Sequence, residues 1–364
     1  MTNTFRLQDL RQEWPALAAA VVGILAFVFE HRIMEAGHLP ALIAAGVLIV
    51  TIVMASIRVA HHAEVLAAKV GDPYGTMILT LSAVAVEVLV LGILMLNVAS
   101  PTLVRDTIYS AVMLDVNGIL GLAAIVGGYR FGEQPYNDDS GRTYVVMILT
   151  AMAISMIVPE FIPDSKWHYY SVFTIFAMAG LYMLFLRQQV GVHSYFFSYS
   201  YPKSRGGETE HGEGATAPSV ILLIAGVVLI GLLAEVMSGF FNEGLQGTGA
   251  PPALAAVVVA AISAAPEILT AMRAALANRM QAVINIALGA SLSTVILTVP
   301  VMEAIALFSG QPFIMAMTPV QTVMVVVTLI VAAINLSDGE TNAIEGMTHF
   351  VLFATFVMLT FLGL

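Results

Sequence analysis

Long apolar segments alternate with short polar or Gly/Pro-containing connections along nearly the whole chain. A helix needs about 20 apolar residues to cross roughly 30 Å of hydrocarbon. The pattern therefore predicts an all-α polytopic membrane protein with eleven transmembrane helices. The predicted spans are Trp14–Phe29, Leu39–Ile57, Gly75–Leu96, Thr107–Gly127, Tyr144–Val158, Tyr169–Leu186, Val220–Met237, Ala253–Met272, Ala282–Phe308, Met317–Leu336 and Ala343–Leu362.

The composition is that of a protein surrounded by lipid. Hydrophobic residues make up 59% of the chain and charged residues 10%, whereas soluble domains carry roughly 25% charged residues. The net charge is −10 and the basic residues are scattered, so we expect the membrane bilayer as partner and no nucleic acid. The chain has no cysteine, which excludes disulfides and thiolate metal sites.

The basic residues predict an orientation in the membrane, because Lys and Arg concentrate on the cytoplasmic side. With a cytoplasmic N-terminus and eleven spans, all 14 Lys and Arg residues except Arg32, Arg105 and Lys166 fall on that side. We therefore expect a multi-pass protein of the plasma (inner) membrane, with its N-terminus in the cytoplasm and its C-terminus outside.

A long polar stretch, Gln188 to Pro218, divides the chain into two groups of spans. Each group contains five spans once the first span of the chain is set aside. Because five is an odd number, the second group enters the membrane with the opposite polarity to the first, as in an inverted repeat. The predicted organisation is an N-terminal segment and extra helix at 1–38, a first five-helix repeat at 39–187, a flexible cytoplasmic linker at 188–218, and a second five-helix repeat at 219–364.

Two carboxylates lie near the middle of apolar spans, in corresponding positions of the two groups. Glu87 ends the run that begins at Ser82, and Glu267 ends the run that begins at Ile262. An ionisable side chain at this depth costs about 2.5 to 3.5 kcal/mol on insertion scales and is functional by default. The alternative is a protonated, hydrogen-bonded glutamate that holds helices together. The pair predicts one cation site at the bilayer midplane.

Pro266 strengthens the prediction for Glu267. A proline cannot donate to the carbonyl four residues earlier and clashes with it, so the helix should bend and release the Ile262 oxygen beside the carboxylate. Ser263 lies four residues before Glu267 and therefore on the same helical face. Together with Ser82, these groups offer the hard oxygen ligands that Ca²⁺ or alkali cations prefer.

A second polar stripe follows each carboxylate span. One helical face of the fourth span carries Asp106, Ser110 and Asn117, and a face of the ninth carries Asn285 and Ser293. Aligning the two carboxylates pairs Asn117 with Ser293 and Asp115 with Ser291. Cation ligation and close helix packing both remain open for these residues. The candidate metal ligands here are Asn117, Asp115, Ser291 and Ser293, and the candidate pathway residues are Asp106, Ser110, Asn285 and Asn335.

Several other polar residues have a structural interpretation as well as a functional one. Asp106 follows Arg105, and its carboxylate either forms an ion pair with Arg105 or lies at the entrance of the ion pathway. Glu235 and Glu303 lie toward the outer ends of their spans, where a side chain reaches water easily. The His61–Glu64 run suggests a solvated linker more than a regulatory metal contact. Glu345 and His349 either line an inner vestibule or pack. The chain has no metalloprotease, serine-hydrolase or Walker motif, so we expect no enzyme or ATP-driven pump.

A set of short segments carries a resemblance to a known family. They are Arg58–His61, Gly71–Gly75, Pro101–Ser110, Ser263–Glu267, Asn278–Met280, Gly289–Thr294, Val299–Val301 and Thr341–Gly346. With these segments the sequence resembles the bacterial calcium/proton antiporters, including the sodium/potassium/calcium-proton type, of the cation/calcium exchanger superfamily. That resemblance implies an extra first helix plus two inverted five-helix repeats, with one essential glutamate in the third helix and one in the eighth, which match Glu87 and Glu267.

The chain departs from the common family motif just before each glutamate. The family has Gly-Asn there, whereas this chain has Ala83-Val84 and Ser263-Ala264. The change is similar to the sodium/potassium/calcium-proton subgroup, and it removes amide oxygens that would help to hold Ca²⁺. We expect a proton-coupled antiporter without a cofactor that exchanges Ca²⁺ for H⁺ by alternating access. A Na⁺/H⁺ or K⁺/H⁺ antiporter of the same fold and a passive cation channel are the alternatives.

Overall fold

The computed structural model describes residues 13–70, 74–97, 100–190, 216–246, 248, 251, 253–311 and 313–364. Most of the predicted linker at 188–218 lies outside these ranges. The described helices form two compact units. The first contains α2 (Trp14–Glu35), α3 (His38–Val70), α4 (Tyr74–Asn97) and α9 (Thr216–Leu245).

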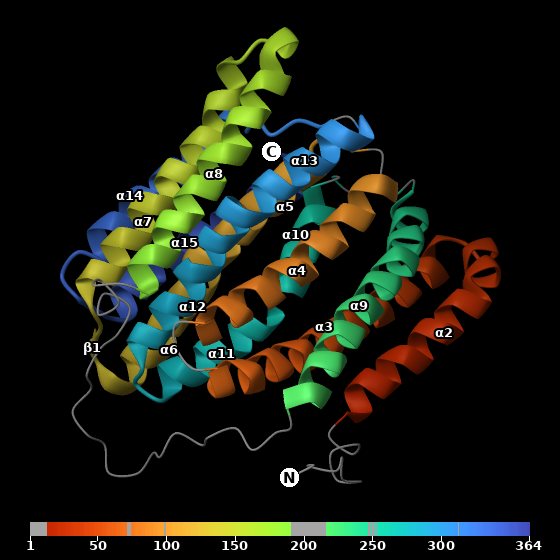
Figure 1. The fold of residues 1–364 in the computed structure, drawn as a ribbon, viewed down its shortest axis with the longest axis horizontal. Helices are drawn as coiled ribbons and strands as arrows, with labels where there is room; N and C mark the ends of the chain where they lie inside the picture. The colour runs from red at the N-terminus through yellow and green to blue at the C-terminus, as the bar shows by residue number, and fades with distance from the viewer. Residues whose placement is uncertain are drawn as a thin grey trace. The chain divides into compact units, whose positions relative to one another are not determined.

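Glycines on α9 explain how the first unit packs. Helix α9 contacts α2, α3 and α4, and Figure 1 shows it running alongside α2 and α3. A Cβ at Gly226 would lie 2.6 Å from the Val59 side chain, and one at Gly231 would lie 2.4 Å from Leu89. Small residues let helix backbones approach closely in membranes, so these two positions define the face of α9 that meets α3 and α4.

The second unit contains the remaining helices (Figure 1). Before the linker they are α5 (Leu103–Met113), η1 (Leu114–Ile119), α6 (Leu120–Phe131), α7 (Asp138–Met152), η2 (Ala153–Ile157), η3 (Val158–Phe161), η4 (Asp164–Lys166) and α8 (Trp167–Val190). After it they are α10 (Ala253–Ser263), α11 (Ala265–Leu276), α12 (Met280–Ser293), η6 (Thr294–Thr298), α13 (Val299–Ser309), α14 (Pro319–Asn335) and α15 (Ala343–Phe361).

Three helices of the second unit are interrupted by a π-helical turn. Element η1 joins α5 to α6, η2 follows α7, and η6 joins α12 to α13. Such turns hold one extra residue within an otherwise regular helix and occur frequently at functional sites. Two of them, η1 and η6, lie next to the polar stripes predicted from the sequence.

A short strand pair fastens three connections of the second unit. Strand β1 (Gln134–Pro135) pairs antiparallel with β2 (Glu340–Thr341). The fully buried Gln134 side chain donates to the Asn278 Oδ1 atom at 2.9 Å and to the Ala275 carbonyl at 3.3 Å. The connections α6–α7, α11–α12 and α14–α15 are therefore joined at one end of the unit.

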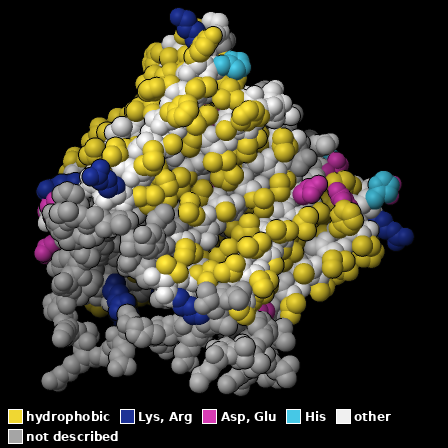
Figure 2. Space-filling model, in the orientation of Figure 1, with side chains coloured by type: hydrophobic (Ala, Val, Ile, Leu, Met, Phe, Trp, Pro, Cys, Tyr) yellow, Lys and Arg dark blue, Asp and Glu magenta, His cyan; other side chains and the backbone are white. Residues whose placement is uncertain are grey.

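The helices are long and apolar enough for a multi-pass membrane protein, as predicted. Among the described residues, eight helices qualify as spans, and the bent pair α10–α11 makes a ninth. Shorter apolar helices cover Thr80–Leu96 and Pro319–Asn335. Figure 2 shows hydrophobic side chains over the helices of the visible face, with charged side chains at its edges. Exposed apolar residues such as Phe308, at 94%, are suited to contact with lipid.

Each of the eleven predicted spans overlaps one of the eight qualifying helices, the bent pair α10–α11 or one of the two shorter apolar helices. The eleven-span layout and the inverted repeats stay predictions. The compact units divide the helices differently from the predicted repeats, because α9 packs with α2, α3 and α4.

Candidate cation site

Glu87 lies within α4 on the part of the helix that the first unit buries. Its side chain is 5% exposed, and Val84, Val86 and Val90 nearby are buried as well. Ser82 precedes it by five residues and is half-buried. The sequence thus places a carboxylate among apolar side chains in the first unit, where the loss of water must be offset by a proton, a cation or polar contacts.

Glu267 lies beside a break in its span, as the sequence predicted. Helices α10 and α11 meet at Ala264 with a bend of 54°. Backbone hydrogen bonds run from Ala264 N to Ala260 O and from Ile268 N to Ala264 O. Pro266 between them has no N–H to give to the Ile262 carbonyl. The bend at Pro266 is therefore confirmed.

The break gives Glu267 a favourable electrostatic position. It occupies the first turn of α11, and its side chain is half-buried. The N-terminus of a helix carries partial positive charge that stabilises a nearby anion, and discontinuous helices of this kind form ion sites in transporters. The Ser263 hydroxyl donates to the Ala260 carbonyl at 3.0 Å, so its oxygen keeps acceptor capacity for a ligand.

The helices that carry the two predicted polar stripes pack against each other in the second unit, through residues beside the stripes. Asp115 lies in η1 and is 2% exposed, and the fully buried Ser291 of α12 donates to its Oδ2 atom at 3.1 Å. These two residues are the pair that the alignment of Glu87 with Glu267 matched. Their contact joins corresponding positions of the two predicted repeats, across 176 residues of sequence.

Asn117, also in η1, has its amide occupied by protein groups. Its Nδ2 atom donates to Thr328 Oγ1 at 2.8 Å, and its Oδ1 atom lies 3.0 Å from His349 Nδ1. Because an amide oxygen only accepts, His349 donates through Nδ1. His349 is 2% exposed, so the structure supports the packing interpretation of this histidine over the vestibule.

Ser293 and Asn285 form contacts within α12, whereas Asn335 joins α14 to α15. Ser293, the last residue of α12 before η6, donates to Ala290 O at 2.9 Å. Asn285 accepts from Gln281 at 3.0 Å, and Asn335 donates to Thr348 Oγ1 at 3.0 Å. The part of the chain that the structure describes contains no group of three His, Cys, Asp or Glu side chains suited to hold a metal ion.

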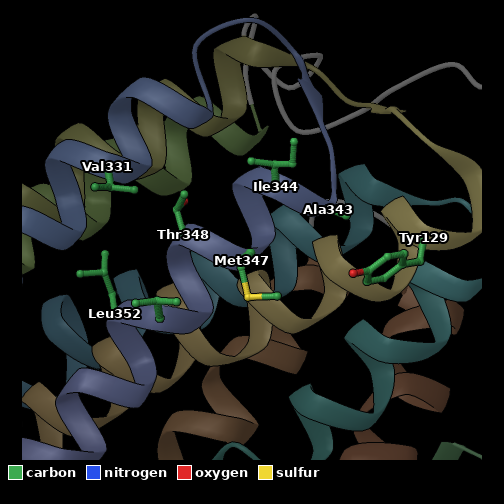
Figure 3. A pocket seen from close by; sticks show the side chains of 8 residues that line it. Tyr129, Val331, Ala343, Ile344, Met347, Thr348 and Leu352 are labelled. Carbon is green, nitrogen blue, oxygen red and sulfur yellow. The ribbon is translucent and has the colours of Figure 1, made fainter.

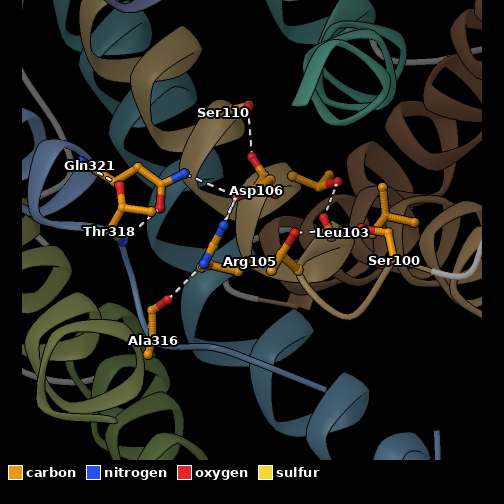
Figure 4. A network of polar contacts seen from close by, with 10 residues as sticks. Ser100, Leu103, Arg105, Asp106, Ser110, Ala316, Thr318 and Gln321 are labelled. Carbon is orange, nitrogen blue, oxygen red and sulfur yellow. Dashed lines mark hydrogen bonds and ion pairs between the residues drawn. The ribbon is translucent and has the colours of Figure 1, made fainter. Parts of the chain in front are cut away.

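Asp106 forms an ion pair with Arg105, which is one of the two interpretations that the sequence allowed. Arg105 donates to its Oδ1 atom from Nε at 2.9 Å and approaches it with Nη2 at 2.8 Å. Gln321 of α14 donates to the same atom at 2.9 Å (Figure 4). The Ser110 hydroxyl donates to the Asp106 carbonyl at 2.6 Å. The carboxylate charge is thus balanced within the network that joins α5 to α14.

The prediction of a solvated linker at His61–Glu64 is wrong. Helix α3 continues through these residues to Val70, and His62 is 6% exposed. Arg58 forms an ion pair with Glu13, just before α2, and His62 Nε2 lies 3.3 Å from Oε1 of the same carboxylate. Burial raises the pKa of the Glu13 carboxyl. The hydrogen bond and charge of Arg58, together with the electrostatic effect of His62, lower this pKa by more than burial raises it, so the net shift is downward.

An apolar cavity of about 670 Å³ lies between α6, α14 and α15. Figure 3 shows side chains of all three helices around it. Thr348 and Tyr129 are the polar residues of its lining, and no carboxylate reaches it. This cavity is therefore chemically unsuited to a cation and separate from the predicted site.

A polytopic helical architecture, buried carboxylates and a broken span together define a membrane transporter rather than an enzyme. The sodium/calcium exchanger protein family matches residues 40–191 and 218–362. The chain belongs to this family.

Individual proteins agree with this assignment. The chain is similar to the sodium-potassium/proton antiporter ChaA of Escherichia coli, with 31% identity covering 93% of this chain and 94% of the relative. It is 24% identical to a Ca(2+)/H(+) antiporter of Synechocystis, over 81% of this chain and 83% of that one. The structure of native YfkE shares the fold, with a TM-score of 0.76, 18% identity, and coverage of 96% and 99%.

Sequence reasoning missed the π-helical turns and the Gln134 contacts. A π-helical turn leaves no periodic signal in a segment that is apolar on nearly every face, because there is no amphipathic pattern for the extra residue to interrupt. Glu87 belongs to the first unit and Glu267 to the second, so the predicted meeting of their carboxylates stays a prediction.

Proposed function

We propose that the chain is a proton-coupled cation antiporter that works by alternating access, with cation and protons competing for Glu87 and Glu267. The observation that carries the proposal is the broken span α10–α11, bent by 54°, with a carboxylate in the first turn after the break. A break at membrane depth is tolerated where the exposed backbone lines a site or cavity. The freed Ile262 carbonyl and Glu267 would then serve one ligand.

Competition between cation and proton would couple their movements. The same carboxylate oxygens bind either a metal ion or protons, so release of one favours uptake of the other. Glu87, buried in the apolar α4, would supply the second carboxylate. Exchange of this kind needs no ATP and no resident cofactor.

Ca²⁺ is the first candidate substrate. It takes 6 to 8 oxygen ligands with flexible geometry, and carboxylates, hydroxyls and a backbone carbonyl are of the right chemistry. The proposed ligands are Glu87, Glu267, Ser82, Ser263 and the Ile262 carbonyl. Asp115, Ser291, Asn117 and Ser293 would support these ligands from neighbouring helical turns.

A monovalent cation is the second candidate, and two observations favour it. Ala83-Val84 and Ser263-Ala264 offer no amide oxygen before either glutamate, which reduces the number of hard ligands. One of the relatives with 31% identity is a sodium-potassium/proton antiporter. We therefore propose that Na⁺ or K⁺ be tested beside Ca²⁺ as the exchanged ion.

Proteoliposomes that contain a pH-sensitive dye test the proposal. Addition of the transported cation to one side should drive proton movement in the opposite direction, and Glu87→Gln and Glu267→Gln should each reduce this signal to background. Ca²⁺, Na⁺ and K⁺ are compared in separate runs. Cation flux that persists without any proton movement would indicate a channel.

Glu340→Gln is the matched control, because this carboxylate is exposed in β2 and outside the predicted site. It should retain full exchange. Retained exchange in both Glu87→Gln and Glu267→Gln, with normal membrane insertion, would refute the assignment of the site.

A further inference from the structure

Another intramembrane carboxyl, Glu303, is not used by the proposed cation site. It lies in α13, which follows the π-helical turn η6. The sequence suggested that it reaches water near the end of its span, but this prediction is wrong because the side chain is 2% exposed. An ionisable group buried within a span requires a specific explanation.

The surroundings of Glu303 provide little to balance a negative charge. Ser171 of α8, 5% exposed, donates to its Oε1 atom at 3.4 Å. Its Oε2 atom is buried and has no hydrogen-bond partner among the described residues. Tyr170 precedes Ser171 on α8 and interacts electrostatically with Glu303, but its hydroxyl donates to the Ile154 carbonyl at 2.7 Å.

No described Lys, Arg or His forms an ion pair with Glu303. The described elements that contact α13 most extensively are α8 and η6. Element η6, Thr294–Thr298, contains no charged residue. An ionised carboxylate here would therefore lie in apolar surroundings with one hydroxyl as its donor, which strongly disfavours the charged form.

We propose that Glu303 and Ser171 form a second proton-binding site, separate from Glu267 and the polar stripes, and that this site holds its proton at neutral pH. The proton is taken from water and binds at Oε2, while Ser171 donates to Oε1 and fixes the carboxyl group. No other bond forms or breaks. The site has one carboxylate and one hydroxyl, too few oxygens for Ca²⁺ but sufficient for a proton.

Infrared spectroscopy of the purified full-length protein in lipid tests this proposal without any transport measurement. A protonated carboxyl in apolar surroundings has a carbonyl stretch distinct from that of a carboxylate. We expect the wild type to show this band at neutral pH and Glu303→Gln to lack it. Raising the pH should diminish the band in the wild type. Ser171→Ala should shift the band, because it removes the hydrogen bond to Oε1.

Controls separate this proposal from the proposed function. Glu340→Gln should retain the band, since its carboxylate is exposed. Glu87→Gln and Glu267→Gln should retain the Glu303 band even where they abolish exchange. Identical spectra for the wild type and a folded Glu303→Gln protein would overturn the proposal. If Glu303→Gln does not fold, an unshifted band in Ser171→Ala overturns it instead.

Discussion

Replacing Pro266 with alanine tests whether the bend in α10–α11 is needed for exchange. Alanine restores the N–H that can donate to the Ile262 carbonyl and removes the clash of the proline ring. A proline within a helix costs about 3 kcal/mol relative to alanine. The variant should therefore favour a straight helix over the bent one by up to about 100-fold, withdraw the Ile262 oxygen, and move Glu267 away from a helix N-terminus.

We expect Pro266→Ala to insert normally, to unfold at the same or a higher temperature, and to lose most proton-coupled exchange in proteoliposomes. Pro319→Ala is the matched control. Pro319 is the first residue of α14 after its N-cap Thr318. A backbone N–H at this position has no carbonyl partner within the helix, so replacing the proline restores no hydrogen bond. Its exchange should stay near that of the wild type. A Pro266→Ala protein with wild-type rate and apparent cation affinity would refute the role of the bend.

Two further predictions concern stability. Ser291→Ala removes a hydrogen bond to the buried Asp115 carboxylate, so the free energy of unfolding should fall by about 1 to 3 kcal/mol. Denaturant titration in detergent measures this change. An unchanged unfolding midpoint would contradict the contact. Glu13 has a lowered pKa in the folded protein, so its stabilising effect is present above its ordinary pKa of 4.5 and is lost as pH falls. The melting temperatures of the wild type and Glu13→Gln should therefore converge as the pH falls below 4.5 and separate above it; a difference that is constant with pH would contradict this linkage.

The sequence was sufficient to predict the helices and the bend, because both depend on local chemistry. A continuous apolar segment requires a helix in lipid, and Pro266 bends its helix whatever surrounds it. The predicted ends were less accurate. The first span was expected to finish at Phe29, yet α2 continues to Glu35, because backbone hydrogen bonding does not stop where the hydrophobic residues stop.

The candidate site could be predicted only as a set of residue types. Matching the two halves of the chain identified Asp115 and Ser291 as corresponding positions, but it did not predict the hydrogen bond between them. The bonds of Asn117 to Thr328 and His349 could not be predicted in the same way. They join residues more than 200 positions apart, and no local pattern specifies which polar side chains meet at such separations.

The contacts of Gln134 restrict how the broken span can move. Its amide holds the C-terminal end of α11, through Ala275, and the following turn, through Asn278. Space for that amide exists only because residue 127 is glycine, where a Cβ would lie 1.7 Å from Gln134 Oε1. Helix α11 is thus anchored at the end farthest from Ala264. A change of the bend at Ala264 would therefore leave the C-terminal end of α11 held to the α6–α7 connection.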